Sequence, residues 1–163
     1  PPMILRLSNT LARKIRVQPP DLHPFNENAF ADWSAHDIRA NREPFVIAVS
    51  TRALYTVVVP ARGIVKAGAL EARIFAHLKD YLVSDGFEFF FRRFIDIDGE
   101  NSTCSKLLNA ESAAVLDDMG QLVEYYLVEE DMAPDDVARK INETPLSALA
   151  QRTPRQAFQS MGF

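Results

Sequence analysis

The sequence predicts an α+β fold: a mainly antiparallel sheet of about five or six strands, packed against two main helices and followed by short C-terminal helices. Two apolar runs separated by a turn, Phe45–Val49 and Leu54–Val59, indicate neighbouring strands. Apolar residues at helical spacing indicate the two helices. In Ala69–Val83 the apolar stripe is Leu70, Ile74, Leu78, Tyr81 and Leu82, and in Ser112–Glu130 it is Val115, Met119, Leu122, Val123 and Tyr126. The length of 163 residues suits one domain, so we expect a single domain over residues 3–163.

The first segment, "MILRL", is a short apolar run that predicts a strand. Ser8 to Thr10 offer hydroxyl oxygens that can cap a short basic helix in "LARKIRV". Residues 18–28 contain three prolines and no periodicity, which predicts a surface loop. Pro1 and Pro2 precede Met3, and we interpret them as an expression remnant, with Met3 as the expected natural start.

The next block is typical of an antiparallel meander. A strand in "WSAHDIRA" leads through the turn "NREP" to Phe45–Val49, and a second turn leads to Leu54–Val59, which Pro60 ends. Both later strands are apolar at nearly every position. Because such strands are usually covered on both faces, we expect them to be central in the sheet.

The remaining elements follow from periodicity. The helix of Ala69–Val83 should end near Gly86. "FEFFFRRFIDI", Phe87 to Ile97, alternates apolar and charged side chains and favours a strand, although Phe90 and Phe94 also fit a helix. "APDDVARKIN" predicts a shorter helix, and the pairs Thr144-Pro145 and Thr153-Pro154 each predict the start of another.

Composition restricts the class of protein. The net charge of -4 argues against nucleic acid as a partner, since non-specific binding needs clustered Lys and Arg. Cys104 is the single cysteine, which excludes an intrachain disulfide and favours the cytoplasm. No apolar run approaches the ~20 residues that span a bilayer, so we expect no membrane association.

The stretch "FADWSAHDIR" gathers the candidate site residues. His36, Asp32 and Asp37 are the candidate catalytic residues. On a strand, however, Ser34 and His36 share one face while Trp33 and Asp37 share the other, so neighbours in sequence do not make a catalytic triad.

Three further residues are candidates for ligand binding: Trp33, Arg39 and Arg42. An exposed Trp beside His36 would favour a recognition surface. The histidines show no paired spacing typical of metal ligands, so we expect no metal and no cofactor.

Several segments, in this order, resemble a known family: "MILRLSNTLARKI", "ADWSAHDI" with "LYTVVVP", "AVLDDMGQLVEYYL" and "INETPLSAL". Together they are similar to an uncharacterised family of small bacterial cytoplasmic proteins, a domain of unknown function. The resemblance covers Met3 to about Phe158 and implies an α+β domain in a bacterial cytoplasm. It implies no catalytic residue.

Without a convergent set of acid, base and nucleophile, the leading hypothesis is a non-enzymatic binding or protein-interaction module. Its partner would be an unidentified protein or a second copy, meeting the exposed edge of the meander or the apolar stripe of Ser112–Glu130. One alternative is a small hydrolase or nuclease with His36 as general base. A further alternative is single-strand nucleic-acid binding through Phe90, Arg92 and Phe94.

Overall fold

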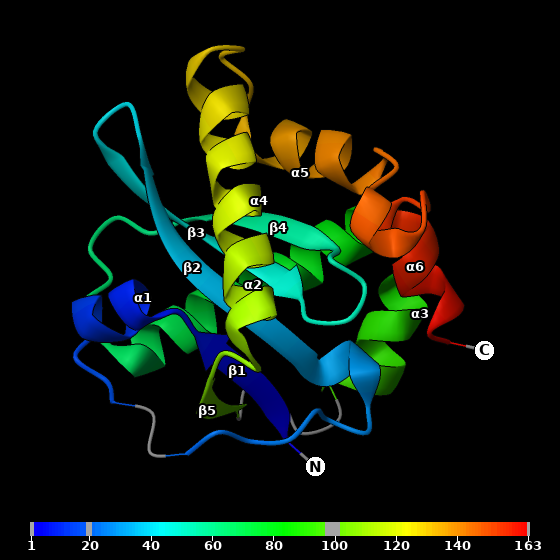
Figure 1. Cartoon of the computed structure of the whole chain (residues 1–163), viewed down its shortest axis with the longest axis horizontal. Helices are drawn as coiled ribbons and strands as arrows, with labels where there is room; N and C mark the ends of the chain where they lie inside the picture. The colour runs from blue at the N-terminus through cyan, green and yellow to red at the C-terminus, as the bar shows by residue number, and fades with distance from the viewer. Residues whose placement is uncertain (1, 19–20, 97–101, 163) are drawn as a thin grey trace.

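The fold is α+β, as predicted, with a five-stranded sheet and helices on both of its faces (Figure 1). The computed structural model describes residues 2–18, 21–96 and 102–162. The strands lie in the order β4-β3-β2-β1-β5. They are β1 (Met3–Leu7), β2 (Asp32–Ala40), β3 (Glu43–Ser50), β4 (Thr56–Pro60) and β5 (Ser102–Lys106).

The sheet is mixed, so the prediction of a mainly antiparallel sheet is only partly right. β2, β3 and β4 form the expected antiparallel meander. β1 runs parallel to both β2 and β5. The difference arises because no tight turn joins β1 to β2: the segment between them includes the short helix Asn9–Lys14, and β2 runs in the same direction as β1. Such a crossover makes neighbouring strands parallel.

Six α-helices are assigned among the described residues. They are α1 (Asn9–Lys14), α2 (Ala67–Ser84), α3 (Glu88–Phe90), α4 (Ala110–Val128), α5 (Pro134–Asn142) and α6 (Pro154–Ser160). None of the described helices is both long enough and apolar enough to cross a membrane.

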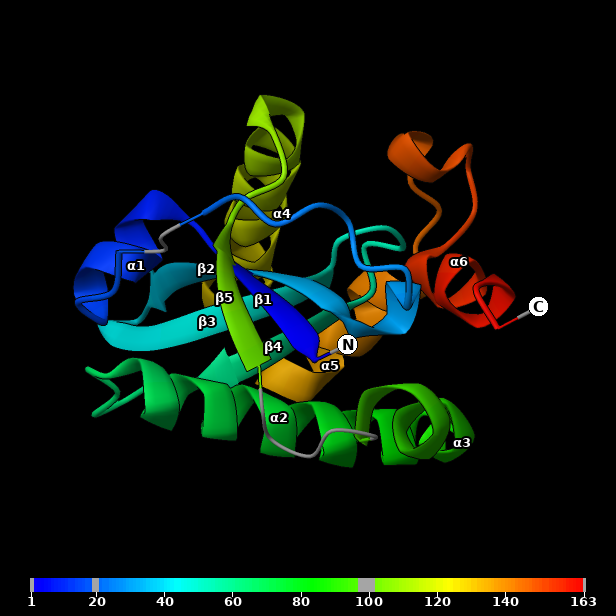
Figure 2. The ribbon, with the colours of Figure 1, turned by 90° about the horizontal axis from the view of Figure 1, so that it is seen from below.

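The two long helices cover opposite faces of the sheet. Figure 2 shows α2 and α3 beneath it and α4 above it. α2 buries the predicted stripe, including Leu70, Ile74 and Leu78. α4 buries Leu116, Met119, Val123 and Leu127, whereas the sequence had suggested a stripe that included Val115, Leu122 and Tyr126, which are only half-buried. The real contact face of α4 is therefore turned slightly from the predicted one.

The prediction of a strand from Phe87 to Ile97 is wrong, and Ile97 lies outside the described residues. Phe87 precedes α3, and Phe91–Ile95 forms a π-helical turn, η2. The helical spacing decided the outcome, because it allows Phe87, Phe90 and Phe94 to pack together. Phe90 and Phe94 both stack on Phe30, with ring centroids 5.0 and 4.7 Å apart. An aromatic cluster thus outweighed the alternating pattern.

β4 is an edge strand, so the prediction that Leu54–Val59 is central is wrong. β3 lies inside the sheet, as expected. β4 is nevertheless buried, because α5 packs along its outer side. The side chain of Asn142 accepts a hydrogen bond from the Thr56 N–H at 2.8 Å and donates one to the Thr56 carbonyl at 2.8 Å. A buried amide therefore replaces a partner strand at this edge.

The two Thr-Pro pairs behave differently. Thr153 begins α6 with a capping box, in which its hydroxyl accepts from the Gln156 N–H and the Gln156 side chain accepts from the Thr153 N–H. No helix begins at Thr144, contrary to the prediction. The short 3-10 helix η4 (Ser147–Leu149) begins three residues later instead.

Candidate functional site

Arg6 of β1 and Asp32 of β2 form a buried ion pair between two neighbouring strands of the sheet. Both side chains are fully buried. Arg6 Nε and Nη2 each donate to one oxygen of the Asp32 carboxylate at 2.8 Å, a two-point contact typical of arginine. The remaining Arg6 protons go to Ser105 Oγ and to the carbonyls of His23, Pro24 and Lys106. The pair therefore ties the loop before β2 to three strands.

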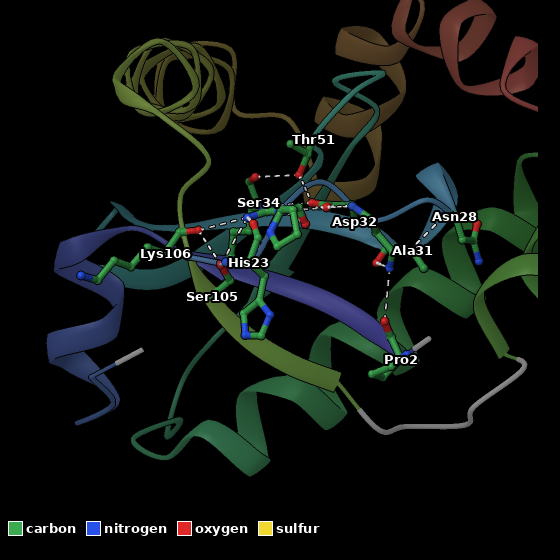
Figure 3. Close-up of polar contacts among 12 residues, drawn as sticks. Pro2, His23, Asn28, Ala31, Asp32, Ser34, Thr51, Ser105 and Lys106 are labelled. Atoms are coloured by element: carbon green, nitrogen blue, oxygen red, sulfur yellow. Dashed lines mark hydrogen bonds and ion pairs between the residues drawn. The ribbon is translucent and has the colours of Figure 1, made fainter. Parts of the chain in front are cut away.

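Asp32 is also the end of a short chain of hydroxyl groups, shown in Figure 3. Thr51 Oγ1 donates to Asp32 Oδ1 at 2.7 Å, and Thr51 Oγ1 lies 2.9 Å from Ser34 Oγ. The Asn26 N–H donates to the other carboxylate oxygen at 3.0 Å. Asp32 thus accepts four hydrogen bonds, which offset the cost of burying its charge.

A cavity of about 190 Å³ opens beside Ser34 and Thr51, between the sheet and the first turns of α4. Its polar lining residues are Ser34, Ser50, Thr51, Arg52, Asn109, Glu111 and Ser112. Its apolar wall consists of Val49, Leu54, Val115, Leu116, Ala148 and Leu149. We call this space the Ser34 cavity. Polar and apolar residues thus contribute about equally to the lining, and the apolar ones offer a surface on which a small aliphatic group can pack.

His36 lies further along the same face of β2, underneath α4. Its Nδ1 is 2.9 Å from Ser8 Oγ, and its Nε2 is 3.9 Å from a carboxylate oxygen of Asp117 in α4. The His36 side chain is 18% exposed. A Cβ placed on Gly120 would lie 3.2 Å from the His36 ring, so α4 approaches this ring closely. Ser8 also caps α1 by accepting from the Leu11 N–H.

Asp37, the other candidate acid, contacts helix α1. Its carboxylate accepts from the Thr10 hydroxyl at 2.5 Å and lies 3.7 Å from His36 Nδ1. The structure therefore brings His36 and Asp37 together, while Asp32 is engaged with Arg6 and Thr51. None of these three residues lines the Ser34 cavity.

Of the three candidate ligand-binding residues, Trp33 lies apart from Arg39 and Arg42. Trp33 is fully buried, and its Nε1 donates to the Phe30 carbonyl at 2.8 Å. Trp33 therefore cannot contact a ligand at the surface. Arg39 and Arg42 are exposed at the tip of the β2–β3 hairpin, where Arg39 Nη2 donates to the Arg42 carbonyl at 2.7 Å.

The segment proposed for nucleic-acid binding has its two named rings engaged in packing. Phe90 and Phe94 stack on Phe30, so their faces are not open to bases. Phe89 is 67% exposed and lines a surface hollow with Arg92 and Arg93. An isolated exposed aromatic residue is ordinary on a protein surface.

Sequence reasoning missed Arg6, Ser8 and Thr51. Arg6 carried a signal, because it is a charged residue inside the apolar strand "MILRL". Ser8 was expected only as a helix cap, and Thr51 carried no signal, since their partners His36 and Asp32 lie 28 and 19 residues away along the chain. Within the parts of the chain that the structure describes, no three His, Cys, Asp or Glu side chains are grouped to hold a metal ion.

Comparison with known proteins identifies the family. No curated protein matches the chain. Residues 4–157, which include the Arg6–Asp32 pair, His36 and the whole lining of the Ser34 cavity, match a domain of unknown function, DUF6933. The match covers most of the chain, in agreement with the resemblance noted from the sequence. The chain therefore belongs to the DUF6933 family.

Proposed function

We propose that the protein is a non-enzymatic binding module of the cytoplasm, which holds a small molecule in the Ser34 cavity. The observation that carries the proposal is the position of Ser34: its side chain lines the cavity and its hydroxyl is fixed through Thr51 to the buried Arg6–Asp32 pair. Polar groups that are fixed in advance lose little freedom when a ligand binds.

The lining favours binding over catalysis. Among the described residues of the wall there is no histidine, and the hydroxyl of Ser34 is already paired with Thr51. A serine nucleophile needs an adjacent base to take its proton. The single cysteine, Cys104, supports a cytoplasmic location.

The test is native mass spectrometry of protein purified gently from a bacterial host, comparing the parent chain with Ala148→Trp. Ala148 lines the cavity but is exposed, so an indole there would fill the space without disturbing the core. We expect the parent chain to carry a small-molecule adduct that the variant lacks.

The matched control is Ala114→Trp, on an exposed position of α4 outside the cavity wall. It should keep the adduct. An adduct that survives Ala148→Trp, or a parent chain that carries none under gentle conditions, would contradict the proposal.

A second candidate is hydrolysis by Ser8 and His36, because Ser8 Oγ lies 2.9 Å from a ring nitrogen of His36. Ser8 is only 7% exposed and also caps α1, so a substrate would need the end of α1 to move. The measurement is hydrolysis of activated esters and phosphodiesters. If purified His36→Ala protein retains the parent rate, this mechanism is excluded.

Self-association is a third candidate, but through a different surface from the sheet edge and helix stripe expected from the sequence. α5 and Asn142 cover the edge at β4, and α4 turns most of its apolar stripe to the sheet. Tyr125 and Val128, near the projecting end of α4, are 51% and 42% exposed. Light scattering of the parent chain and of Tyr125→Glu would show whether this end joins two copies. A monomer at high micromolar concentration excludes it.

A further inference from the structure

We propose that the Ser34 cavity selects small aliphatic molecules whose head group donates a hydrogen bond, such as alcohols and amines, and discriminates against heads that only accept, such as carboxylates and ketones. This inference rests on the proposed binding function and names the class of ligand. It follows from the direction in which the protons of the hydroxyl chain must point.

The donor and acceptor roles in the hydroxyl chain are set by Asp32 of the buried ion pair. The carboxylate of Asp32 only accepts hydrogen bonds, so the single hydroxyl proton of Thr51 is used in the 2.7 Å contact with Asp32 Oδ1. Thr51 Oγ1 then has only lone pairs to offer Ser34, 2.9 Å away. Ser34 must therefore donate its own proton to Thr51.

The consequence appears in the cavity wall. Ser34 is 5% exposed, and its proton is committed to Thr51, so its oxygen presents only lone pairs to a ligand. A ligand N–H or O–H can pair with these lone pairs. A carbonyl or carboxylate oxygen of a ligand would face the lone pairs of Ser34 with no proton to share. Neither the ligand oxygen nor the lone pairs of Ser34 would then be hydrogen-bonded.

The rest of the wall defines the body of the ligand. Six apolar residues surround the polar floor: Val49, Leu54, Val115, Leu116, Ala148 and Leu149. A volume of about 190 Å³ is equivalent to roughly six molecules of liquid water at about 30 Å³ each. A branched skeleton of about five carbons is of this size.

The charges at the rim are balanced. Arg52 and Glu111 both line the cavity and are both exposed. The Arg52 guanidinium lies over the Phe25 ring, 4.4 Å from its centroid. One positive and one negative exposed side chain leave little net preference for a charged head.

Asn109, which is exposed, and Ser112, which is half-buried, also line the cavity, and water can satisfy their polar groups. The buried hydroxyl of Ser50 accepts from the Ala53 N–H. We therefore assign the selection to the buried hydroxyl of Ser34.

The experiment uses four probes with similar branched bodies: isoamyl alcohol, isoamylamine, isovalerate and methyl isobutyl ketone. Binding to the full chain is followed by amide chemical shifts in ¹H–¹⁵N NMR spectra at millimolar probe concentrations. We expect the alcohol and the amine to bind about tenfold more tightly than the ketone and the carboxylate, which corresponds to one unsatisfied acceptor pair. The ketone is uncharged, so it separates the effect of the donor from the effect of charge.

Two variants test the proton direction. In Thr51→Val, Ser34 loses its acceptor and can turn its proton into the cavity, so the ketone should bind about as tightly as the alcohol. In Ser34→Ala, which leaves the ion pair untouched, the alcohol should weaken to the affinity of the ketone. The same spectra report whether each variant is folded.

Equal binding of alcohol and ketone by the parent chain would overturn the proton-direction inference. Ala148→Trp separates this failure from a failure of the binding function. Probes that bind without head-group preference but are blocked by Ala148→Trp would leave the binding function standing. Shifts that Ala148→Trp does not affect, or the absence of shifts with all four probes, would remove both proposals.

Discussion

At the scale of single residues, the buried Arg6–Asp32 ion pair joins more segments of the chain by hydrogen bonds than either residue could alone. A buried charge is tolerated only when hydrogen bonds satisfy it. Here each carboxylate oxygen of Asp32 accepts one hydrogen bond from Arg6 and a second one from Thr51 or Asn26. The sequence made Asp32 a candidate acid. The structure makes it the residue that fixes the hydroxyl chain and, through Arg6, the loop before β2.

At this scale we predict that Asp32→Asn destabilises the protein by about 3–5 kcal/mol, because Arg6 would keep its buried charge without a counter-charge. Chemical denaturation at neutral pH is the measurement. Asp117→Asn is the control: its side chain is 61% exposed and should matter by no more than about 0.5 kcal/mol. Equal losses in the two variants would contradict a special role for the pair.

Among the elements, α4 shows how helix packing depends on one small residue. Gly120 faces β2, and a Cβ there would lie 3.2 Å from both His36 Cδ2 and Ile38 Cγ2. Neither neighbour moves easily, since Ile38 is buried and the His36 ring contacts Ser8. The glycine lets the helix lie close to the sheet, which helps to enclose the Ser34 cavity at the first turns of the same helix.

We therefore predict that Gly120→Ala lowers stability by roughly 1 kcal/mol, since overpacking at His36 and Ile38 outweighs the gain in helix propensity. Gly68→Ala in α2 is the matched control, because nothing lies within 4 Å of a Cβ at that position. It should be neutral or slightly stabilising. Thermal unfolding of both variants decides the point, and a Gly120→Ala protein more stable than Gly68→Ala would refute it.

For the whole molecule, buried tyrosines link stability to pH. Tyr55 is fully buried, and burial together with its hydrogen bond to Asp85 raises the pKa of its phenol far above the usual value of about 10. Below pH 10 the phenol is protonated in both states, so its contribution to stability is complete. Above pH 10 the unfolded chain loses this proton while the folded chain keeps it. Stability must then fall as pH rises.

We predict that the free energy of unfolding decreases between pH 10 and 11, with Tyr55 contributing up to about 1.4 kcal/mol per pH unit. Urea denaturation at several pH values measures this slope. It should be shallower in Tyr55→Phe, whereas Tyr125→Phe, at an exposed position, should keep the parent slope. Identical slopes in all three proteins would contradict the assignment to Tyr55.

The sequence by itself determined the α+β class, the antiparallel meander, both long helices and the capped start of α6. Each follows from local information: periodicity, turn residues and capping residues act over a few positions. Only tertiary structure decided that β1 lies between β2 and β5, and that β4 is an edge closed by Asn142. It also decided that residues 88–95 are helical, with Phe90 and Phe94 stacked on Phe30, since long-range packing overrides local alternation.

For the candidate site, too, the sequence located some features and only the tertiary structure showed the others. The sequence located the polar strand containing Ser34 and His36, and alternation along a strand placed these two on one face. It could not show that Arg6 neutralises Asp32, that Thr51 joins Asp32 to Ser34, or that Trp33 is buried. The hydrogen bonds among Arg6, Asp32, Thr51 and Ser34 join residues 17 to 26 positions apart in sequence, and folding alone brings them together.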